Sequence, residues 1–171
     1  MIVVSDTSPL RYLILIEAVD VLFELFGEVL IPPAVVAELV HTNAPLAVRD
    51  WMAAAPGWLK IQAPSSLRPI GRLDPGEVEA ISLALEIDAD QLIIDDRSGK
   101  QTAQSFGLSA VGTLAILDLA GRRGLLDFRK AITTLEADTN FRMSRRLRDQ
   151  LLLDHPAGDA GGESTSDVDP A

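Results

Sequence analysis

Residues 2–10 read IVVSDTSPL, and this stretch decides what kind of fold the chain can adopt. The run Ile2–Ser5 is short, apolar and mostly β-branched, which is typical of a strand buried on both faces of a parallel sheet. Asp6 ends the run, and Ser8 followed by Pro9 gives the N-cap and first-turn signals of a helix. A buried strand that leads directly into a helix predicts the first half of a strand–helix–strand unit.

The same arrangement recurs along the chain. Further strands are predicted at Val29–Ile31, Leu59–Gln62, Leu92–Ile94 and Ser109–Val111. Helices are predicted from Ser8 toward Ala18, at Ala34–Val40, from the Asp74-Pro75-Gly76-Glu77 start signal to about Glu86, and at Arg97–Phe106, Thr113–Ala120, Phe128–Glu136 and Ser144–Leu153. This alternation predicts an α/β fold, a three-layer α/β/α sandwich with a central, mostly parallel sheet of about five strands.

The composition limits the chemistry that the chain can perform. The 171 residues include no Cys and two His, which excludes disulfides, zinc ribbons and thiol nucleophiles and nearly excludes a His-based triad. No signal peptide is expected, because Asp6 interrupts the apolar start. No stretch approaches the roughly 20 apolar residues of a membrane span. The sequence therefore predicts a single-domain, soluble, cytoplasmic protein.

The net charge of −10 is unevenly distributed. Residues 1–96 contain 15 acidic and 5 basic residues, whereas residues 97–154 contain 6 acidic and 10 basic residues. The basic residues of the second part include Arg142, Arg145, Arg146 and Arg148. This part could bind a polyanion while an acidic site elsewhere holds cations, or its arginines could form a solvated helix face. Residues 155–171 are acidic and almost free of apolar side chains, which predicts a disordered tail after a domain of residues 1–154.

Several carboxylates follow strands or open helices at positions where they should meet. Asp6 ends the first predicted strand, and Asp95 and Asp96 end the fourth, so neighbouring parallel strands would bring them to one edge of the sheet. Glu38 and Glu77 flank the apolar faces of their helices. Carboxylates in one crevice repel one another, and a divalent cation removes that repulsion. Mg²⁺ or Mn²⁺ accepts such oxygen ligands, and metal-assisted hydrolysis of a phosphodiester needs neither His nor Cys.

The order of these motifs resembles that of the PIN-domain nucleases over residues 1–125. The matching segments are Val4-Ser5-Asp6-Thr7-Ser8-Pro9-Leu10, Pro33–Leu39 and Leu73–Asp96. Gly71–Ala80 and Gly112-Thr113-Leu114 look like a less characterised prokaryotic branch of predicted nucleic-acid-binding proteins, and similarity to VapC-type toxins is more distant.

The resemblance implies a Mg²⁺- or Mn²⁺-dependent endoribonuclease with an RNA substrate. It also implies a homodimer and, if the protein is the toxin of a toxin–antitoxin pair, a cognate antitoxin. The catalytic and metal-binding residues that it implies are Asp6, Glu38, Glu77 and Asp96.

One departure from the family pattern and several close neighbours leave the site residues open. The usual third-position Asp is Glu77 here, and the nearby Glu79 is a rival for that role. Asp95 is likewise a rival metal ligand to Asp96. Each carboxylate also has a structural alternative, either as a helix cap or as a solvated surface residue.

Other polar and aromatic residues also allow two interpretations. Arg97 and Lys100 could contact substrate phosphate or could reduce the local acidity. The Gly112-Thr113 pair could bind an anion at a helix start or could simply cap that helix. The aromatic residues Trp51, Trp58 and Phe106 are predicted to serve packing rather than base stacking.

Two other functions compete with the nuclease. The first is a non-catalytic PIN-like module that binds nucleic acid or protein through its surface. The second is an aspartyl-phosphate protein, since Asp6 follows a first strand and Lys100 lies near the acid pair in sequence. A phosphatase would have a second Asp two residues after the first, and Ser8 occupies that position here.

Overall fold

The computed structural model describes residues 1–157 of the chain. Its strands are β1 (Val3–Ser5), β2 (Val29–Ile31), β3 (Leu59–Ile61), β4 (Gln91–Ile93) and β5 (Ala110–Val111). The helices among these residues are α1 (Thr7–Leu15), α2 (Val21–Phe26), α3 (Pro33–Leu39), α4 (Leu46–Ala53), α5 (Pro75–Glu86), α6 (Arg97–Ser105), α7 (Thr113–Arg122), α8 (Phe128–Asp138) and α9 (Arg145–Asp154). Most of the tail predicted for residues 155–171 lies outside the described residues.

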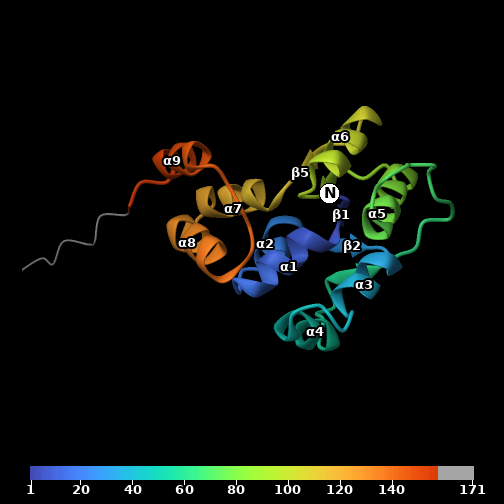
Figure 1. The fold of residues 1–171 in the computed structure, drawn as a ribbon, viewed down its shortest axis with the longest axis horizontal. Coiled ribbons are helices and arrows are strands. Elements are labelled where there is room, and N and C mark those ends of the chain that lie inside the picture. Colours follow the sequence, from blue (N-terminus) through green and yellow to red (C-terminus); the bar gives the residue numbers. More distant parts are fainter. Residues whose placement is uncertain (158–171) are drawn as a thin grey trace, which may run out of the picture.

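All five strands belong to one parallel sheet in the order β3-β2-β1-β4-β5 (Figure 1). β1 is central, and the chain builds outward from it first through β2 and β3 and then, after crossing over, through β4 and β5. Ser5 pairs with Ile93, so both central strands end at the same level. Ligands of open α/β sheets bind at such a reversal of strand order, beyond the carboxyl ends of the strands.

The sheet is covered on both faces, which confirms the predicted three-layer arrangement. Neighbouring residues of a strand point to opposite faces, and Val3 packs in one core cluster while Val4 packs in the other. The cluster around Val4 contains side chains of α5 and α6, and the cluster around Val3 contains side chains of α1, α2, α7 and α8. Both valines are fully buried, as expected for the central strand of a parallel sheet.

The first helix differs from the prediction at both ends. Ser8 does not cap it, because the helix already begins at Thr7 and the extended backbone of Asp6 occupies the N-cap position. The helix ends at Leu15 and not near Ala18, since Glu17 adopts a left-handed conformation (φ 57°) that a helix cannot continue. The short helices α2 and α4 were not predicted. In neither helix does an N-cap side chain bond to the first turn: Pro45 precedes α4, and Asp20, although a favoured N-cap residue, makes no such bond before α2.

The aromatic prediction holds for the two tryptophans. Trp51 and Trp58 contact each other, and both pack against the core. Phe106 is about half exposed, so its predicted packing role is at the surface and stays a prediction.

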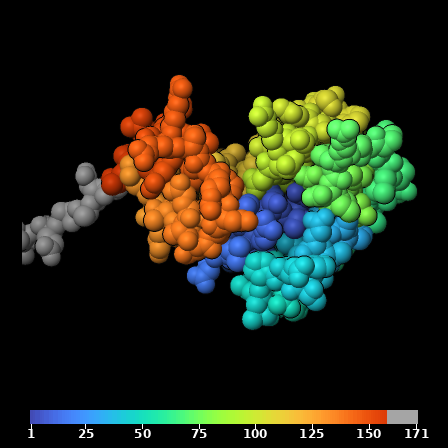
Figure 2. All heavy atoms as spheres, in the orientation of Figure 1, coloured from blue at the N-terminus to red at the C-terminus, as the bar shows by residue number. Residues whose placement is uncertain are grey.

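The C-terminal helices form one side of a hollow in the surface. Figure 2 shows α8 and α9 on one side of this hollow, α6 on the other, and N-terminal residues at its floor. His155, which follows α9, stacks on Phe128 with ring centroids 3.9 Å apart, so the packed part of the chain includes this residue. None of the helices in residues 1–157 has the length and apolar character that crossing a bilayer requires.

Candidate active site

Asp6 lies directly after β1 and is the most buried carboxylate of the predicted set. Its side chain is 3% exposed, and its Oδ1 atom has no hydrogen-bond partner among residues 1–157. Burial raises the pKa of Asp6 to about 7, and the nearby carboxylates of Glu77 and Glu38 contribute to this rise. Asp6 is therefore a carboxyl group that holds its proton up to about neutral pH, and a positive charge placed beside it would favour the ionised form.

Glu38 is held between two other helices. It accepts hydrogen bonds from the hydroxyl of Thr7 at the start of α1 and from the N–H of Gly76 in α5, the latter at 2.9 Å. Gly76 leaves the room for this contact, since a Cβ atom at that position would lie 2.7 Å from both carboxylate oxygens of Glu38. The Glu38 carboxylate thus fills the space left by the missing side chain of Gly76 and lies near Asp6.

Glu77 and Asp96 combine a structural role with a place in the same site. Glu77 closes the predicted capping box by accepting the Asp74 N–H at 3.1 Å, and Asp96 caps α6 by accepting the Gly99 N–H at 2.9 Å. The second oxygen of each carboxylate makes no hydrogen bond within the described chain. Burial and the neighbouring charge of Asp96 raise the pKa of Glu77.

The four predicted site residues come together around one cavity. Asp6, Glu38, Glu77 and Asp96 all line a cavity of about 660 Å³, here called the acidic cavity. They come from the end of β1, from α3, from the first turn of α5 and from the start of α6. No three acidic or histidine side chains of residues 1–157 converge closely enough to form a complete metal cage. The arrangement is an open cluster of carboxylates at the switch point of the sheet.

The two rival carboxylates point to other partners. Asp95 accepts the N–H and the hydroxyl of Thr113, at 2.7 and 2.6 Å, and so binds the start of α7. Burial raises the pKa of Asp95, although these two hydrogen bonds oppose the rise. Glu79 accepts the N–H of Ala34 at 2.8 Å and joins α5 to the start of α3. Neither residue lines the acidic cavity, which favours Glu77 and Asp96 over them.

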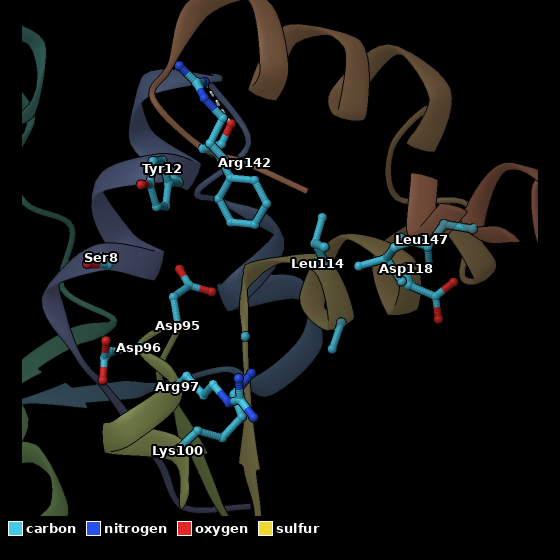
Figure 3. A pocket seen from close by; sticks show the side chains of 14 residues that line it. Ser8, Tyr12, Asp95, Asp96, Arg97, Lys100, Leu114, Asp118, Arg142 and Leu147 are labelled. Atoms are coloured by element: carbon cyan, nitrogen blue, oxygen red, sulfur yellow. Dashed lines mark hydrogen bonds between the residues drawn. The ribbon is translucent and has the colours of Figure 1, made fainter. Parts of the chain in front are cut away.

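A second cavity, of about 690 Å³, adjoins the acidic cavity and shares Ser8 and Asp96 with it. It corresponds to the hollow between α6 and the C-terminal helices, and its cationic side chains are those of Arg97, Lys100 and Arg142 (Figures 2 and 3). We call it the basic groove. Within residues 1–157 none of these three cations forms an ion pair. The groove therefore places three cationic side chains next to the carboxylate cluster, and Lys100 also attracts Asp95, which lines the same groove.

Sequence analysis anticipated the cations of this groove in part. Arg97 and Lys100 were candidates for phosphate contact, and both line the groove. Of the four clustered arginines only Arg142 lines it, while Arg148 pairs with Glu136 at 3.3 Å. The anion site considered at Gly112-Thr113 is already used, because Asp95 binds the Thr113 N–H.

Two residues that hold Glu38 were missed. Thr7 belongs to the motif after the first strand, and Gly76 belongs to the start signal of α5, and neither pattern by itself indicates a contact with Glu38. A glycine in the first turn of a helix is unfavourable unless another group packs closely against it. Gly76 was therefore the sequence signal that could have indicated a close contact at the start of α5.

Replacing Gly76 by Ala is expected to destabilise the protein, although Ala usually favours a helix by roughly 0.5–1 kcal/mol over Gly. The added Cβ would lie 2.7 Å from the Glu38 oxygens, so that carboxylate must move. We expect the melting temperature to fall by about 2–4 °C, which corresponds to about 1 kcal/mol for a chain of this length. Thermal denaturation followed by circular dichroism measures the change.

The reason for this loss can be isolated with a double-mutant cycle. In a Glu38→Ala background the clash is absent, and Gly76→Ala should then be neutral or stabilising. Gly71→Ala is the matched control, since nothing lies within 4 Å of a Cβ atom placed there. A higher melting temperature for Gly76→Ala in the wild-type background would contradict the assigned contact.

Comparisons with known proteins were made for the whole chain. The family model described as "DUF3368: PIN domain" matches residues 2–155, which include all four carboxylates of the acidic cavity. Among solved structures, the chain is similar to a PilT N-terminus domain protein from the hyperthermophilic archaeon Sulfolobus solfataricus P2. The two are 18% identical with a TM-score of 0.49, and the match covers 84% of this chain and 100% of the archaeal chain. No curated protein sequence matched the chain.

Proposed function

The chain belongs to the PIN-domain family, and from this premise we propose that it is a metal-dependent ribonuclease that hydrolyses phosphodiester bonds in RNA. PIN domains are generally nucleases. The observation that carries the proposal is that Asp6, Glu38, Glu77 and Asp96 line one cavity that adjoins a groove with three cationic side chains. A cluster of carboxylates alone repels a polyanion such as RNA. A metal cation held by the carboxylates, together with the cationic side chains of the groove, attracts it.

A divalent cation suits these residues. The buried Oδ1 of Asp6 has no partner within the described residues, and the pKa of Asp6 is raised to about 7, so a nearby cation would relieve both features. Asp6, Glu38, Glu77 and Asp96 would hold Mg²⁺ or Mn²⁺. These ions keep several waters, so one or two direct carboxylates suffice. When bound, the metal supplies a more acidic water and stabilises negative charge that develops at phosphorus.

The other residues of the two cavities position the substrate and the carboxylates. Thr7 and Gly76 fix Glu38, and the capping box fixes Glu77 at the start of α5. Arg97 and Lys100 lie beside Asp96 in the basic groove and bind the phosphates that flank the scissile bond. The hydroxyl of Ser8 lies where the two cavities meet and can hydrogen-bond a water or a phosphate oxygen there.

Replacing Asp96 by Asn tests the proposal and separates catalysis from capping. Asn caps a helix about as well as Asp, so the fold should be retained while the negative charge is lost. With Mg²⁺ or Mn²⁺ and a mixed panel of RNAs, we expect cleavage to fall on the order of 10²-fold or more. Gel analysis of the RNA products measures the rate, and thermal denaturation checks the fold.

Asp127→Asn is the matched control for this experiment. Asp127 caps α8 by accepting the Lys130 N–H, as Asp96 caps α6, but it lies outside both cavities. Its replacement should leave cleavage unchanged. Equal residual cleavage in the wild type and both variants would reject the assignment of the site.

A specific observation also favours the non-catalytic alternative. Glu38, Glu77 and Asp96 each accept a backbone N–H in this fold, so the chain has a structural reason to keep these carboxylates. In that case the protein would bind RNA or another protein without cleaving RNA. Binding to the RNA panel without metal-dependent products would support this second function.

The proposal includes a toxin role, which depends on partners. If the protein acts in the cytoplasm as the RNA-cleaving toxin of a toxin–antitoxin pair, an antitoxin and a second copy of the chain are its expected partners. A small reading frame immediately upstream would support the antitoxin. The mass of the purified protein in solution would test the homodimer.

A further inference from the structure

The end of the basic groove that lies away from Asp96 is lined mainly by apolar side chains, beside the carboxylate of Asp118. Leu114 of α7, Phe141 of the segment before α9, and Leu147 and Leu151 of α9 line it. In Figure 3 Ser8 and Asp96 lie at one end of the groove, Leu114 and Leu147 lie toward the other, and the cations lie along its sides. Leu147 is 41% exposed in this position. A ligand that fills this end would cover apolar surface that now faces water.

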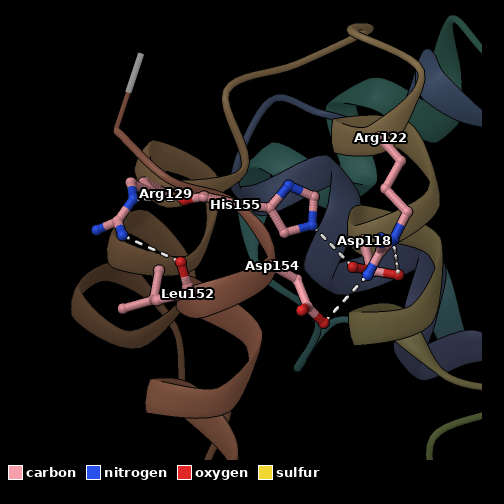
Figure 4. Close-up of polar contacts among 6 residues, drawn as sticks. All are labelled: Asp118, Arg122, Arg129, Leu152, Asp154 and His155. Atoms are coloured by element: carbon pink, nitrogen blue, oxygen red, sulfur yellow. Dashed lines mark hydrogen bonds and ion pairs between the residues drawn. The ribbon is translucent and has the colours of Figure 1, made fainter. Parts of the chain in front are cut away.

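The apolar wall is rigidly held, so it does not depend on a ligand to form. The hydroxyl of Tyr12 donates to Asn140 at 2.9 Å, and the Tyr12 and Phe141 rings meet edge to face with centroids 5.1 Å apart. At the C-terminal end of α9, Arg129 donates to the carbonyl oxygens of Leu152 and His155, at 3.0 and 2.6 Å (Figure 4). These contacts fix both ends of the segment that carries Phe141 and Leu147.

The two carboxylates at this side of the groove are already bound within the protein. Asp118 lies 2.7 Å from the His155 ring nitrogen Nε2 and accepts from Arg122 at 3.0 Å (Figure 4). Both oxygens of Asp95 accept from Thr113. Hydrogen bonds from Thr113 leave Asp95 charged when it is ionised, and Lys100 attracts this carboxylate. Among residues 1–157 the groove cations Arg97, Lys100 and Arg142 form no ion pair, and the carboxylates of Asp95 and Asp96 oppose them.

We propose that the apolar end of the basic groove is a subsite for one unpaired nucleobase of the RNA, next to the phosphates held by the three cations. This inference rests on the proposed function, since it assumes that RNA enters the groove. Cationic side chains beside an aromatic and leucine-lined recess match a nucleotide, which joins a charged phosphate to a flat apolar base. A base paired in a duplex cannot enter the recess, so the subsite selects a single strand and gives the enzyme a preference at one position.

The test compares two labelled six-nucleotide ligands with the same number of phosphates, an oligouridylate and an abasic oligomer. Binding is measured by fluorescence anisotropy in EDTA, where no metal-dependent cleavage occurs. We expect the wild type to bind the base-containing ligand roughly 5- to 100-fold more tightly than the abasic one. Phe141→Ala and Leu147→Ser should each reduce this preference, and Phe141→Tyr should retain it. Arg142→Gln should weaken the binding of both ligands equally and lower its salt dependence.

Leu153→Ser is the matched control, because Leu153 belongs to the same helix as Leu147 but is 80% exposed and lies outside the groove. It should leave the preference unchanged. Leu147→Ser alters a partly exposed side chain and should fold normally. The subsite can therefore still be tested if the Phe141→Ala variant does not fold. Equal binding of the two ligands by the wild type, or a preference that survives Leu147→Ser and Phe141→Ala, would overturn the subsite.

These binding results are independent of the cleavage assay. A base preference without any cleavage would reject the nuclease and retain the subsite. Cleavage without a base preference would reject the subsite and retain the nuclease.

Discussion

Replacement of Asp6 by Asn is expected to lower RNA cleavage on the order of 10²–10³-fold, the largest effect expected for a single side chain of the site. Asp6 is the most buried of the four carboxylates, and its Oδ1 has no partner among the described residues. An Asn at this position has the same shape but offers a neutral oxygen to a cation. Initial rates of RNA cleavage with Mn²⁺ at saturating RNA measure the loss.

The same replacement should make the metal-free protein more stable at pH 8. The pKa of Asp6 is about 7 in the folded chain against an ordinary value of 3.8, so the folded state holds this proton more tightly than the unfolded state. The free energy of unfolding therefore falls as pH rises from about 4 to 7 and is level above that range. The decrease in the free energy of unfolding that Asp6 causes over this pH range is on the order of 4 kcal/mol, at 1.36 kcal/mol per pKa unit. Because Asn does not ionise, the free energy of unfolding of the variant does not decrease in this way as pH rises.

The measurement is the difference between wild-type and variant unfolding free energies in EDTA, from pH 4 to pH 8. The two proteins should be similar near pH 4, and the variant should become the more stable one as pH rises. Asp20→Asn is the control, since Asp20 occupies an exposed N-cap position and makes no cap hydrogen bond. A variant that is less stable than the wild type at pH 8 would contradict the burial of a carboxylate at position 6 whose Oδ1 has no partner among residues 1–157.

The convergence of Asp6 and Asp96 could be predicted from the sequence, whereas the choice between Asp95 and Asp96 could not. Parallel strands end at a common edge, so an acidic residue after each of two neighbouring strands must reach the same crevice. Asp95 and Asp96 are adjacent, and their directions depend on the turn between β4 and α6. In the structure that turn directs Asp95 to Thr113 and leaves Asp96 at the cavity.

Contacts between distant segments account for the rest of what was missed. The groove joins Tyr12 to Phe141 across more than a hundred residues, and no local pattern relates two such positions. The Gly76–Glu38 contact likewise needs the packing of α5 on α3. In contrast, α9 was predicted to within one residue because its signals are local. Ser144 caps it by accepting the Leu147 N–H, as a Ser before a helix usually does.

Addition of Mn²⁺ should raise the melting temperature of the wild type and not that of Asp6→Asn. A ligand that binds only the folded state stabilises it by about 2.7 kcal/mol at one hundred times its dissociation constant. For a chain of this length that is a rise of roughly 5–10 °C. The rise should be larger at pH 8 than at pH 6, because the cation must replace the proton that Asp6 holds up to a pH of about 7.

Differential scanning fluorimetry at constant ionic strength measures this stabilisation. Glu38→Gln should also reduce it, since Glu38 lies beside Asp6 and contributes to the rise of its pKa. Asp127→Asn removes a carboxylate outside the cavity and should retain the full rise. An equal rise in the wild type and in Asp6→Asn would mean that Mn²⁺ binds elsewhere, and the carboxylates would then have to be explained by their hydrogen bonds to the fold. A rise confined to proteins with an intact cavity would instead make metal binding, and not folding, the reason that the chain keeps at the centre of its sheet a buried carboxylate whose Oδ1 has no partner in the described part of the chain.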